Sequence, residues 1–154
     1  IVGKLHRLRV AEPRAAYSQR PPLVADASVL AAAVFKEQGR DEARALLHGR
    51  SLHAPYLLDF EIANVSLKKL TLERLGRETV AAALRAYGQL AIERHGVDAE
   101  AMLAIAERYR LTAYDAAYLC VAERLGAPLA TLDGKLADAA RAYLTNERQV
   151  HEPA

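Results

Sequence analysis

The sequence has little cysteine, few aromatic residues and no long apolar run, and each shortage excludes a class of protein. Its 154 residues include one cysteine and no tryptophan, and aromatic side chains make up 6%. The single thiol, Cys120, excludes an internal disulfide and a cysteine-based zinc site, and it suits a reducing cytoplasm. No apolar run approaches the roughly 18 to 20 residues that a membrane-spanning helix needs. We therefore expect a soluble, single-domain, cytoplasmic protein that has no membrane partner.

Several motifs of known chemistry are also missing. The histidines are His6, His48, His53, His95 and His151. None of them forms a His-x-x-x-His or similar pair, so no histidine-based metal or acid–base site is expected. The sequence has no glycine-rich phosphate loop and no Gly-x-Ser-x-Gly elbow, which disfavours a nucleotide-binding fold and a serine hydrolase.

Charge is distributed unevenly along the chain. Residues 1–22 hold five basic residues and one acidic residue, which leaves 16 basic and 18 acidic residues in 23–154. A folded part with this balance is not a general polyanion-binding surface. We interpret residues 1–21 as a basic N-terminal extension, either flexible or a remnant of cloning, that ends at Pro21-Pro22. The domain is expected over residues 22–143, and residues 144–154 form a charged C-terminal tail.

Short apolar stretches alternate with helical patterns from Pro22 onward, and 52% of all residues are apolar. Strands are predicted over 23–25, 51–54, 90–93 and 128–132. Helices are predicted over 28–38, 41–48, 56–70, 77–87, 98–109, 112–125 and 134–143. Their expected N-caps include Ser28, Asp98 and Thr112, and Gly39 and Gly126 are expected to end two of them. Strands separated by helices indicate an α/β fold with a short, mainly parallel central sheet and helices on both faces.

Acidic residues follow two of the predicted strands. Asp26 comes after the first strand and Asp133 after the last, and ligand sites in parallel sheets lie beyond the carboxyl ends of the strands. Each acid alone is explained equally well as a helix cap. Asp115 fits a capping box with Thr112, and Glu61 fits a solvated helix face.

The coincidence of these acids favours a functional interpretation. Carboxylates that lie within a few ångströms raise one another's pKa values unless a cation is present. Ligand sets made of oxygen atoms alone select hard cations such as Mg²⁺ or Mn²⁺. Such ions commonly activate water and hold a phosphodiester during its displacement. Tyr114 and Tyr118, on either side of Asp115, are interpreted as packing residues.

Three segments, LVADASVLAAAV, LLDFEIANVSLKKL and LTAYDAAYLCVAERLGAPLATLD, follow one another over about residues 22–141. Their order and spacing resemble those of PIN-domain nucleases, particularly VapC-type toxins. The resemblance implies a PIN-like three-layer sandwich. It also implies a catalytic quartet of Asp26, Glu61, Asp115 and Asp133, with Ser28, Asn64 and Thr131 at accessory polar positions. The N-terminal extension is foreign to the family pattern.

This resemblance implies a Mg²⁺- or Mn²⁺-dependent endoribonuclease that acts on RNA, forms homodimers and is inhibited by a cognate VapB-type antitoxin. Asp26 and Asp115 would hold the primary ion, and Glu61 would help to position that ion and its water. Asp133 would support a second ion or orient the attacking water. Two alternatives stay open, a PIN nuclease that processes RNA without being a toxin and a non-catalytic PIN-fold binding module.

Surplus apolar residues in two predicted helices indicate a groove for the antitoxin. The helices are those over 28–38, with Val29, Leu30, Val34 and Phe35, and over 56–70, with Leu57, Leu58, Phe60 and Ile62. The alternative is that both helices are simply central and buried.

Overall fold

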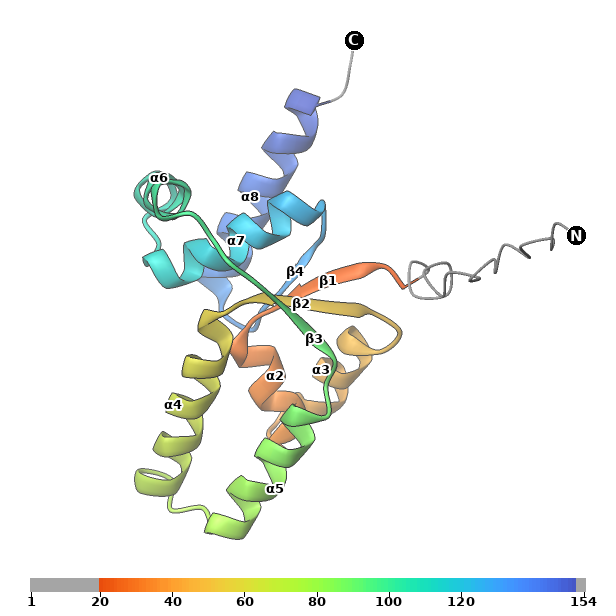
Figure 1. Ribbon diagram of the computed structural model, residues 1–154, viewed down its shortest axis with the longest axis vertical. Helices are drawn as coiled ribbons and strands as arrows, with labels where there is room; N and C mark the ends of the chain where they lie inside the picture. The colour runs from red at the N-terminus through yellow and green to blue at the C-terminus, as the bar shows by residue number, and fades with distance from the viewer. Residues whose placement is uncertain (1–19, 152–154) are drawn as a thin grey trace, which may run out of the picture.

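The computed structural model describes residues 20–151, in which four strands and seven helices alternate (Figure 1). In chain order they are β1 (Pro22–Ala25), α2 (Ala27–Val34), α3 (Arg40–Leu47), β2 (Ser51–Pro55), α4 (Leu57–Thr71), α5 (Arg77–Gly88), β3 (Ile92–His95), α6 (Ala99–Tyr109), α7 (Ala113–Leu125), β4 (Leu129–Ala130) and α8 (Gly134–His151). Over this range, no helix combines the length and the apolar character that crossing a membrane requires. The predicted basic extension lies, up to residue 19, outside the described residues.

The strands form one parallel sheet in the order β3-β2-β1-β4. On one side of β1, Val24 is opposite His53 of β2, and on the other side Ala25 is opposite Ala130 of β4. The chain thus first builds the sheet outward from β1 through β2 and β3, and then returns to the other side of β1. In parallel sheets the crevice at such a reversal is where ligands bind.

Helices cover both faces of the sheet, as Figure 1 shows. The helices α6, α7 and α8 lie on one face, and α2, α3, α4 and α5 lie on the other. The main core surrounds β1 and α2, where Val24, Val29 and Leu30 have no exposed surface. This arrangement confirms the predicted α/β fold with a parallel central sheet and helices on both faces.

Two predicted helix starts and one predicted helix end are confirmed by their capping bonds. Asp98 accepts a hydrogen bond from the Ala101 amide at 3.0 Å, and Thr112 accepts one from the Asp115 amide at 3.1 Å. Gly126 ends α7 with a φ of +57°, a left-handed conformation that glycine adopts without a side-chain clash.

The limits of α2 differ from the prediction at both ends. Asp26 is its N-cap in place of Ser28, and its carboxylate accepts a hydrogen bond from the Val29 amide at 3.2 Å. The helix ends at Val34 and does not reach Gly39. Gly39 instead precedes α3 with a φ of +87°, so it allows a turn between two helices.

Three elements in the second half also differ from the prediction. The strand expected over 90–93 is displaced along the chain and includes His95. Only Leu129–Ala130 of the expected strand 128–132 pair with β1, which leaves Thr131 beyond the strand. The last helix, expected to end at Tyr143, continues to His151, because no glycine or proline interrupts residues 144–151.

A group of hydrogen bonds ties the first turn of α4 to β3. Arg94 donates to the Asp59 carboxylate at 2.8 and 3.1 Å, and the Tyr87 hydroxyl donates to it at 2.6 Å. These bonds to Arg94 hold the pKa of Asp59 below its usual value. They fix the start of the helix that carries Glu61.

Candidate active site

The buried carboxylate of Asp26 lies at the carboxyl end of β1 and is held through both of its oxygens. Oδ1 accepts from the Ser28 hydroxyl at 2.6 Å and from the Val29 amide, and Oδ2 accepts from the Thr131 hydroxyl at 2.5 Å. Only 6% of the residue is exposed. Burial raises the pKa of Asp26, and the hydrogen bonds from Ser28 and Thr131 oppose that rise. Two of the predicted accessory residues, Ser28 and Thr131, therefore contact this acid.

Glu61 lies on α4 with its carboxylate directed toward α7. The Tyr118 hydroxyl donates to Glu61 Oε2 at 2.5 Å. Burial raises the pKa of Glu61 most, and the negative charges of Asp26 and Asp115 raise it further, whereas the Tyr118 hydrogen bond lowers it. The structure thus brings Asp26, Glu61 and Asp115 close enough for their charges to interact.

Asp115 is in the first turn of α7, but its carboxylate does not complete a capping box. Its amide donates to Thr112 Oγ1, which is the first half of that motif. Over the described residues, no hydrogen bond joins the Thr112 amide to the Asp115 carboxylate. The side chain is half-buried, and its charge acts on Glu61 of the acidic cluster.

Asp133 plays the capping role that was one of its two predicted explanations. Its carboxylate accepts from the Leu136 amide at 2.9 Å at the start of α8, and the residue is exposed. Its own amide donates to Thr131 Oγ1 at 3.0 Å, and that hydroxyl in turn donates to Asp26. Asp133 is therefore linked to Asp26 through Thr131, at the edge of the cluster.

Asn64 is the predicted accessory residue that the structure leaves apart. It lies on the exposed side of α4, three residues after Glu61, and makes no side-chain hydrogen bond within residues 20–151. Ser28 has a second contact that Asn64 lacks, because its hydroxyl accepts from the Leu132 amide at 2.9 Å. That bond holds the segment after β4 against the start of α2.

Within the described residues, the acids of the cluster form no ion pair with a basic side chain. Every ion pair within residues 20–151 uses other carboxylates, such as Asp59 with Arg94 and Glu73 with Lys69. Three interacting carboxylates, one of them buried, form a set of oxygen donors whose repulsion a divalent cation would relieve. The donor set therefore fits a hard cation.

Tyr118 has a role at the site that the sequence analysis did not predict. It was predicted to be a packing residue, and it is 1% exposed, but its hydroxyl also holds Glu61. Tyr114, the other residue predicted to pack, is 63% exposed. No local sequence signal distinguishes these two tyrosines. Their difference follows from the helical phase of α7, since Tyr118 faces the sheet.

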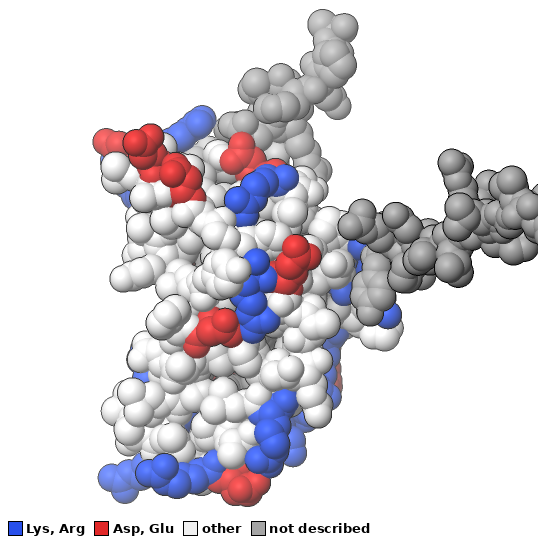
Figure 2. All heavy atoms as spheres, viewed as in Figure 1, with Lys and Arg blue, Asp and Glu red and all other residues white. Residues whose placement is uncertain are grey.

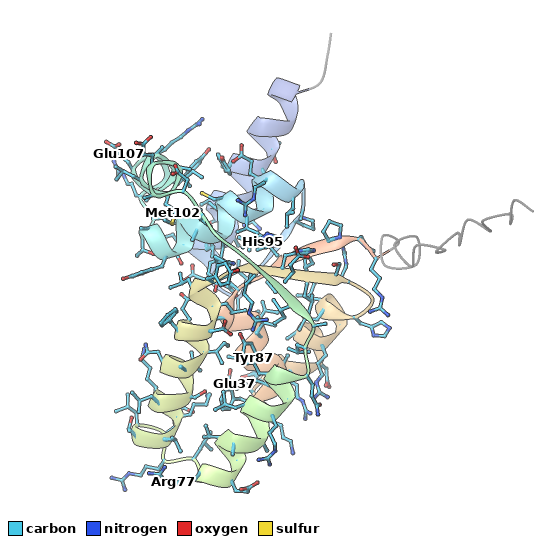
Figure 3. All side chains as sticks on the ribbon, viewed as in Figure 1. Glu37, Arg77, Tyr87, His95, Met102 and Glu107 are labelled. Atoms are coloured by element: carbon cyan, nitrogen blue, oxygen red, sulfur yellow. The ribbon has the colours of Figure 1, made fainter. Side chains whose placement is uncertain are left out.

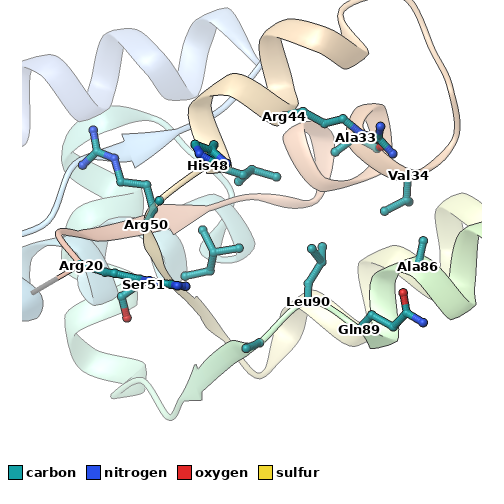
Figure 4. A pocket seen from close by; sticks show the side chains of 14 residues that line it. Arg20, Ala33, Val34, Arg44, His48, Arg50, Ser51, Ala86, Gln89 and Leu90 are labelled. Carbon is teal, nitrogen blue, oxygen red and sulfur yellow. The ribbon is translucent and has the colours of Figure 1, made fainter. Parts of the chain in front are cut away.

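A hollow of about 590 Å³ lies near the amino ends of the strands, away from the acidic cluster, and its charged side chains are basic (Figure 4). Arg20, Arg44, Arg50 and His48 line it, together with apolar residues of α2, α3 and α5 and no carboxylate. Arg20 is the one basic residue of the predicted extension that the structure describes. It lies before β1, away from the carboxyl ends of the strands where the acids gather.

Together, the fold and this cluster define an α/β protein with a group of carboxylates at the point where the strand order of a parallel sheet reverses. The PIN domain family model matches residues 23–142. The VapC ribonuclease Mb0985 of Mycobacterium bovis is 35% identical over 120 residues, which cover 78% of this chain and 92% of that protein. Ribonuclease VapC3 of Pyrobaculum aerophilum is 33% identical over 129 residues, 80% of this chain and 98% of that protein.

The fold has a counterpart among solved structures. The crystal structure of PAE2754 from Pyrobaculum aerophilum aligns with a TM-score of 0.62 at 22% identity, covering 84% of this chain and 90% of that one. The chain belongs to the PIN domain family. The resemblance predicted from the sequence is thereby confirmed.

Proposed function

We propose that this protein is a divalent-metal-dependent endoribonuclease of the VapC toxin type that hydrolyses phosphodiester bonds in RNA. The observation that carries the proposal is the buried Asp26 carboxylate with Glu61 and Asp115 beside it, and no basic residue among 20–151 forms an ion pair with them. Two of the relatives are named as ribonucleases, which supports the same activity.

Asp26 and Asp115 are proposed to hold Mg²⁺ or Mn²⁺, with Glu61 and Asp133 completing the acidic quartet. When bound, such an ion supplies activation of water and stabilisation of charge on the phosphate. The acids fit the ion because they are oxygen donors. Burial, and then the negative charges of Asp26 and Asp115, raise the pKa of Glu61, and a cation would offset both effects.

The residues around the acids position them. Ser28 and Thr131 each donate to one oxygen of Asp26, so the carboxylate cannot rotate without losing a bond. Tyr118 holds Glu61 in the same way from α7. These hydrogen bonds fix the orientation of the two carboxylates in the absence of substrate, which is the kind of positioning that catalysis requires.

RNA cleavage by the full chain tests the proposal. Cleavage should require Mg²⁺ or Mn²⁺ and stop in EDTA, and Asp26→Asn should lower the rate at least about 100-fold. Asp138→Asn is the matched control, because it removes one exposed carboxylate of α8 outside the cluster. Equal rates for wild type and Asp26→Asn would remove Asp26 from the site.

We further propose that a VapB-type antitoxin inhibits the protein by binding across α4. The predicted groove is corrected in part, because Phe35 of α2 and Leu58 of α4 are buried in the molecule's own core. The outward side of α4 nevertheless exposes Phe60 by 75% and Leu67 by 56%. Figure 2 shows largely uncharged surface over this helix. Exposed apolar surface of this kind is typical of a protein interface.

Binding of the product of the neighbouring gene tests this partner. Phe60→Ser should weaken that complex at least about 10-fold, since buried aromatic residues dominate interface energies. Leu103→Ser on α6 removes a comparably exposed apolar side chain and serves as the control.

The remaining proposals concern assembly and location. We propose a homodimer that acts in the cytoplasm, where its RNA substrate is found. Light scattering on the purified chain tests the dimer. The nuclease domain is proposed to span 22–143, between the basic extension 1–21 and a charged tail whose residues 144–151 continue α8.

A further inference from the structure

Three potential metal ligands meet on the edge strand β3 and its neighbour β2, apart from the acidic cluster. β2 and β3 pair in parallel with His53 opposite Glu93 and Pro55 opposite His95. Since side chains alternate along a strand, His53, Glu93 and His95 point to one face. This is the α7 face, because Arg94 points the other way to Asp59 of α4. Figure 3 labels His95 on this part of the sheet.

The ligand atoms of these residues are close to one another. His53 Nδ1 lies 3.0 Å from His95 Nε2 and 3.7 Å from Glu93 Oε2. One ligand atom from each of the three residues lies within 4.8 Å of the other two. They are the nitrogen and oxygen donors of a His₂Glu set, which Zn²⁺ binds in proteins.

These distances suit a tetrahedral ion. With Zn–N bonds of about 2.0–2.1 Å, two ligand nitrogens lie about 3.3–3.4 Å apart at the tetrahedral angle. The two histidines therefore need to separate by only a few tenths of an ångström. Glu93 is on an edge strand with 70% of its side chain exposed, so an ion can enter from solvent and keep a water as its fourth ligand.

The surroundings prepare the histidines for this role. Ser51 Oγ lies 3.0 Å from His53 Nε2. This contact orients the ring so that Nδ1 faces His95, to which it is hydrogen-bonded, and Glu93, as an outer partner orients a metal-bound histidine. Two charged side chains lie near His95, the positive Arg124 of α7 and the negative Glu93 of its own strand.

We propose that His53, Glu93 and His95 form a second cation site, specific for a borderline metal such as Zn²⁺, that joins the edge strand β3 to β2. Imidazole donors select Zn²⁺, Co²⁺ or Ni²⁺ over Mg²⁺, so the site differs in chemistry from the carboxylate cluster. It also differs in place, because the cluster lies at the ends of β1 and β4. The inference does not depend on the proposed ribonuclease activity.

Metal titration of the full chain tests the proposal. The reference protein is Asp26→Asn, in which the carboxylate cluster is weakened as a competing site, and bound metal is first removed with EDTA. Co²⁺ should bind one per chain with the visible absorption of a tetrahedral nitrogen-ligated ion, and Zn²⁺ should displace it. Zn²⁺ should also raise Tm by several degrees, because an ion that binds only the folded state stabilises it.

Substitutions of the ligands then identify the site. Added to the reference, His95→Gln should weaken Co²⁺ binding about 100-fold and Glu93→Gln about 10-fold. Glu93→Gln keeps the proposal testable if loss of a histidine disturbs the fold, because that side chain is mostly exposed. His48→Gln, an exposed histidine outside this group, should change nothing. Unchanged binding in His95→Gln, or no binding by the reference at millimolar metal, would overturn the proposal.

Discussion

The acidic cluster and the histidine group are two regions of one sheet that differ in how their side chains come together. The acids lie just after strands or near helix N-termini, at the carboxyl ends of the strands. The strand order of the sheet reverses there, beside β1. The histidines stand within neighbouring strands and meet through the register that places Pro55 opposite His95. Topology therefore assembles the first region, and strand pairing assembles the second.

Burial has opposite consequences in the two regions. It raises the pKa of Asp26 and Glu61, so the charged form of each acid is strained in the folded protein. It lowers the pKa of His95, so the neutral form that binds a metal is favoured. A cation would relieve the repulsion in the first region, whereas in the second it would meet a His95 ring whose neutral form is already favoured.

Asp115→Asn should produce the largest difference between the two regions, because it should reduce RNA cleavage and leave Zn²⁺ binding unchanged. Because the carboxylate takes no part in the cap of α7, Tm should change by less than about 2 °C. RNA cleavage should fall at least about 100-fold, since a member of the acidic cluster loses its charge. Zn²⁺ binding should be unchanged. A loss of stability of about 1 kcal/mol with full activity would instead identify Asp115 as a helix cap only.

Tyr118→Phe should have a smaller effect on the same region. The hydroxyl lowers the pKa of Glu61, so its removal should raise that pKa and move the acid limb of the pH–rate profile to higher pH. We expect cleavage at neutral pH to fall about 10-fold. Tyr114→Phe is the matched control, because that exposed hydroxyl does not contact the cluster. An acid limb that does not move would show that Glu61 does not limit the reaction.

Asp133→Ala should lower stability more than it lowers activity. It removes the cap of α8, which is worth about 1 kcal/mol. In a chain of this size that corresponds to a Tm lower by about 2–4 °C. Asp133→Asn keeps the acceptor oxygen for the Leu136 amide and should keep most of that stability. If Asp133→Asn abolishes cleavage as Asp115→Asn does, Asp133 belongs to the centre of the cluster.

The pH dependence of stability should distinguish the regions by its sign. The raised pKa of Asp26 means that the folded state binds its proton more tightly, so this residue contributes stability at low pH that is lost as pH rises through the raised value. In EDTA, Asp26→Asn should therefore be more stable than wild type by a few degrees at pH 7. That difference should vanish toward the ordinary aspartate pKa of 3.8.

Stabilisation by Zn²⁺ should show the reverse dependence on pH. It should disappear on acidification, because protonated histidines do not bind metals. Differential scanning calorimetry across pH measures both effects on the same samples. A gap between Asp26→Asn and wild type that stays constant from pH 4 to 7 would contradict the assignment of strain to Asp26.

The sequence was sufficient to predict the acids because their positions follow from local rules. An acid just after a strand, as at Asp26, or in the first turn of a helix, as at Asp115, is placed by its own element. The parallel sheet then brings these positions to one edge. The same rules could not decide whether an acid is a helix cap or part of a site. In the structure Asp26 has both roles, because it is the N-cap of α2 and also belongs to the cluster.

The histidine group could not be predicted in this way. His53 and His95 are 42 residues apart, and no motif spacing relates them. The predicted strand ended at residue 93, so His95 was outside the sheet in the sequence interpretation and inside it in the structure. The expectation that no histidine-based site exists rested on local spacing alone, and strand register is a non-local property.

The hydrogen bond from Thr131 to Asp26 also bears on when the site forms during synthesis of the chain. It joins residues 105 positions apart, so it forms only when nearly the whole domain has been synthesised. A nascent chain that ends within α7 already contains Asp26, Glu61 and Asp115, but it lacks β4, the strand that completes the sheet beside β1. Such distant pairings form late in folding. The hydrogen bonds that hold Asp26 are therefore complete only after most of the domain has been synthesised.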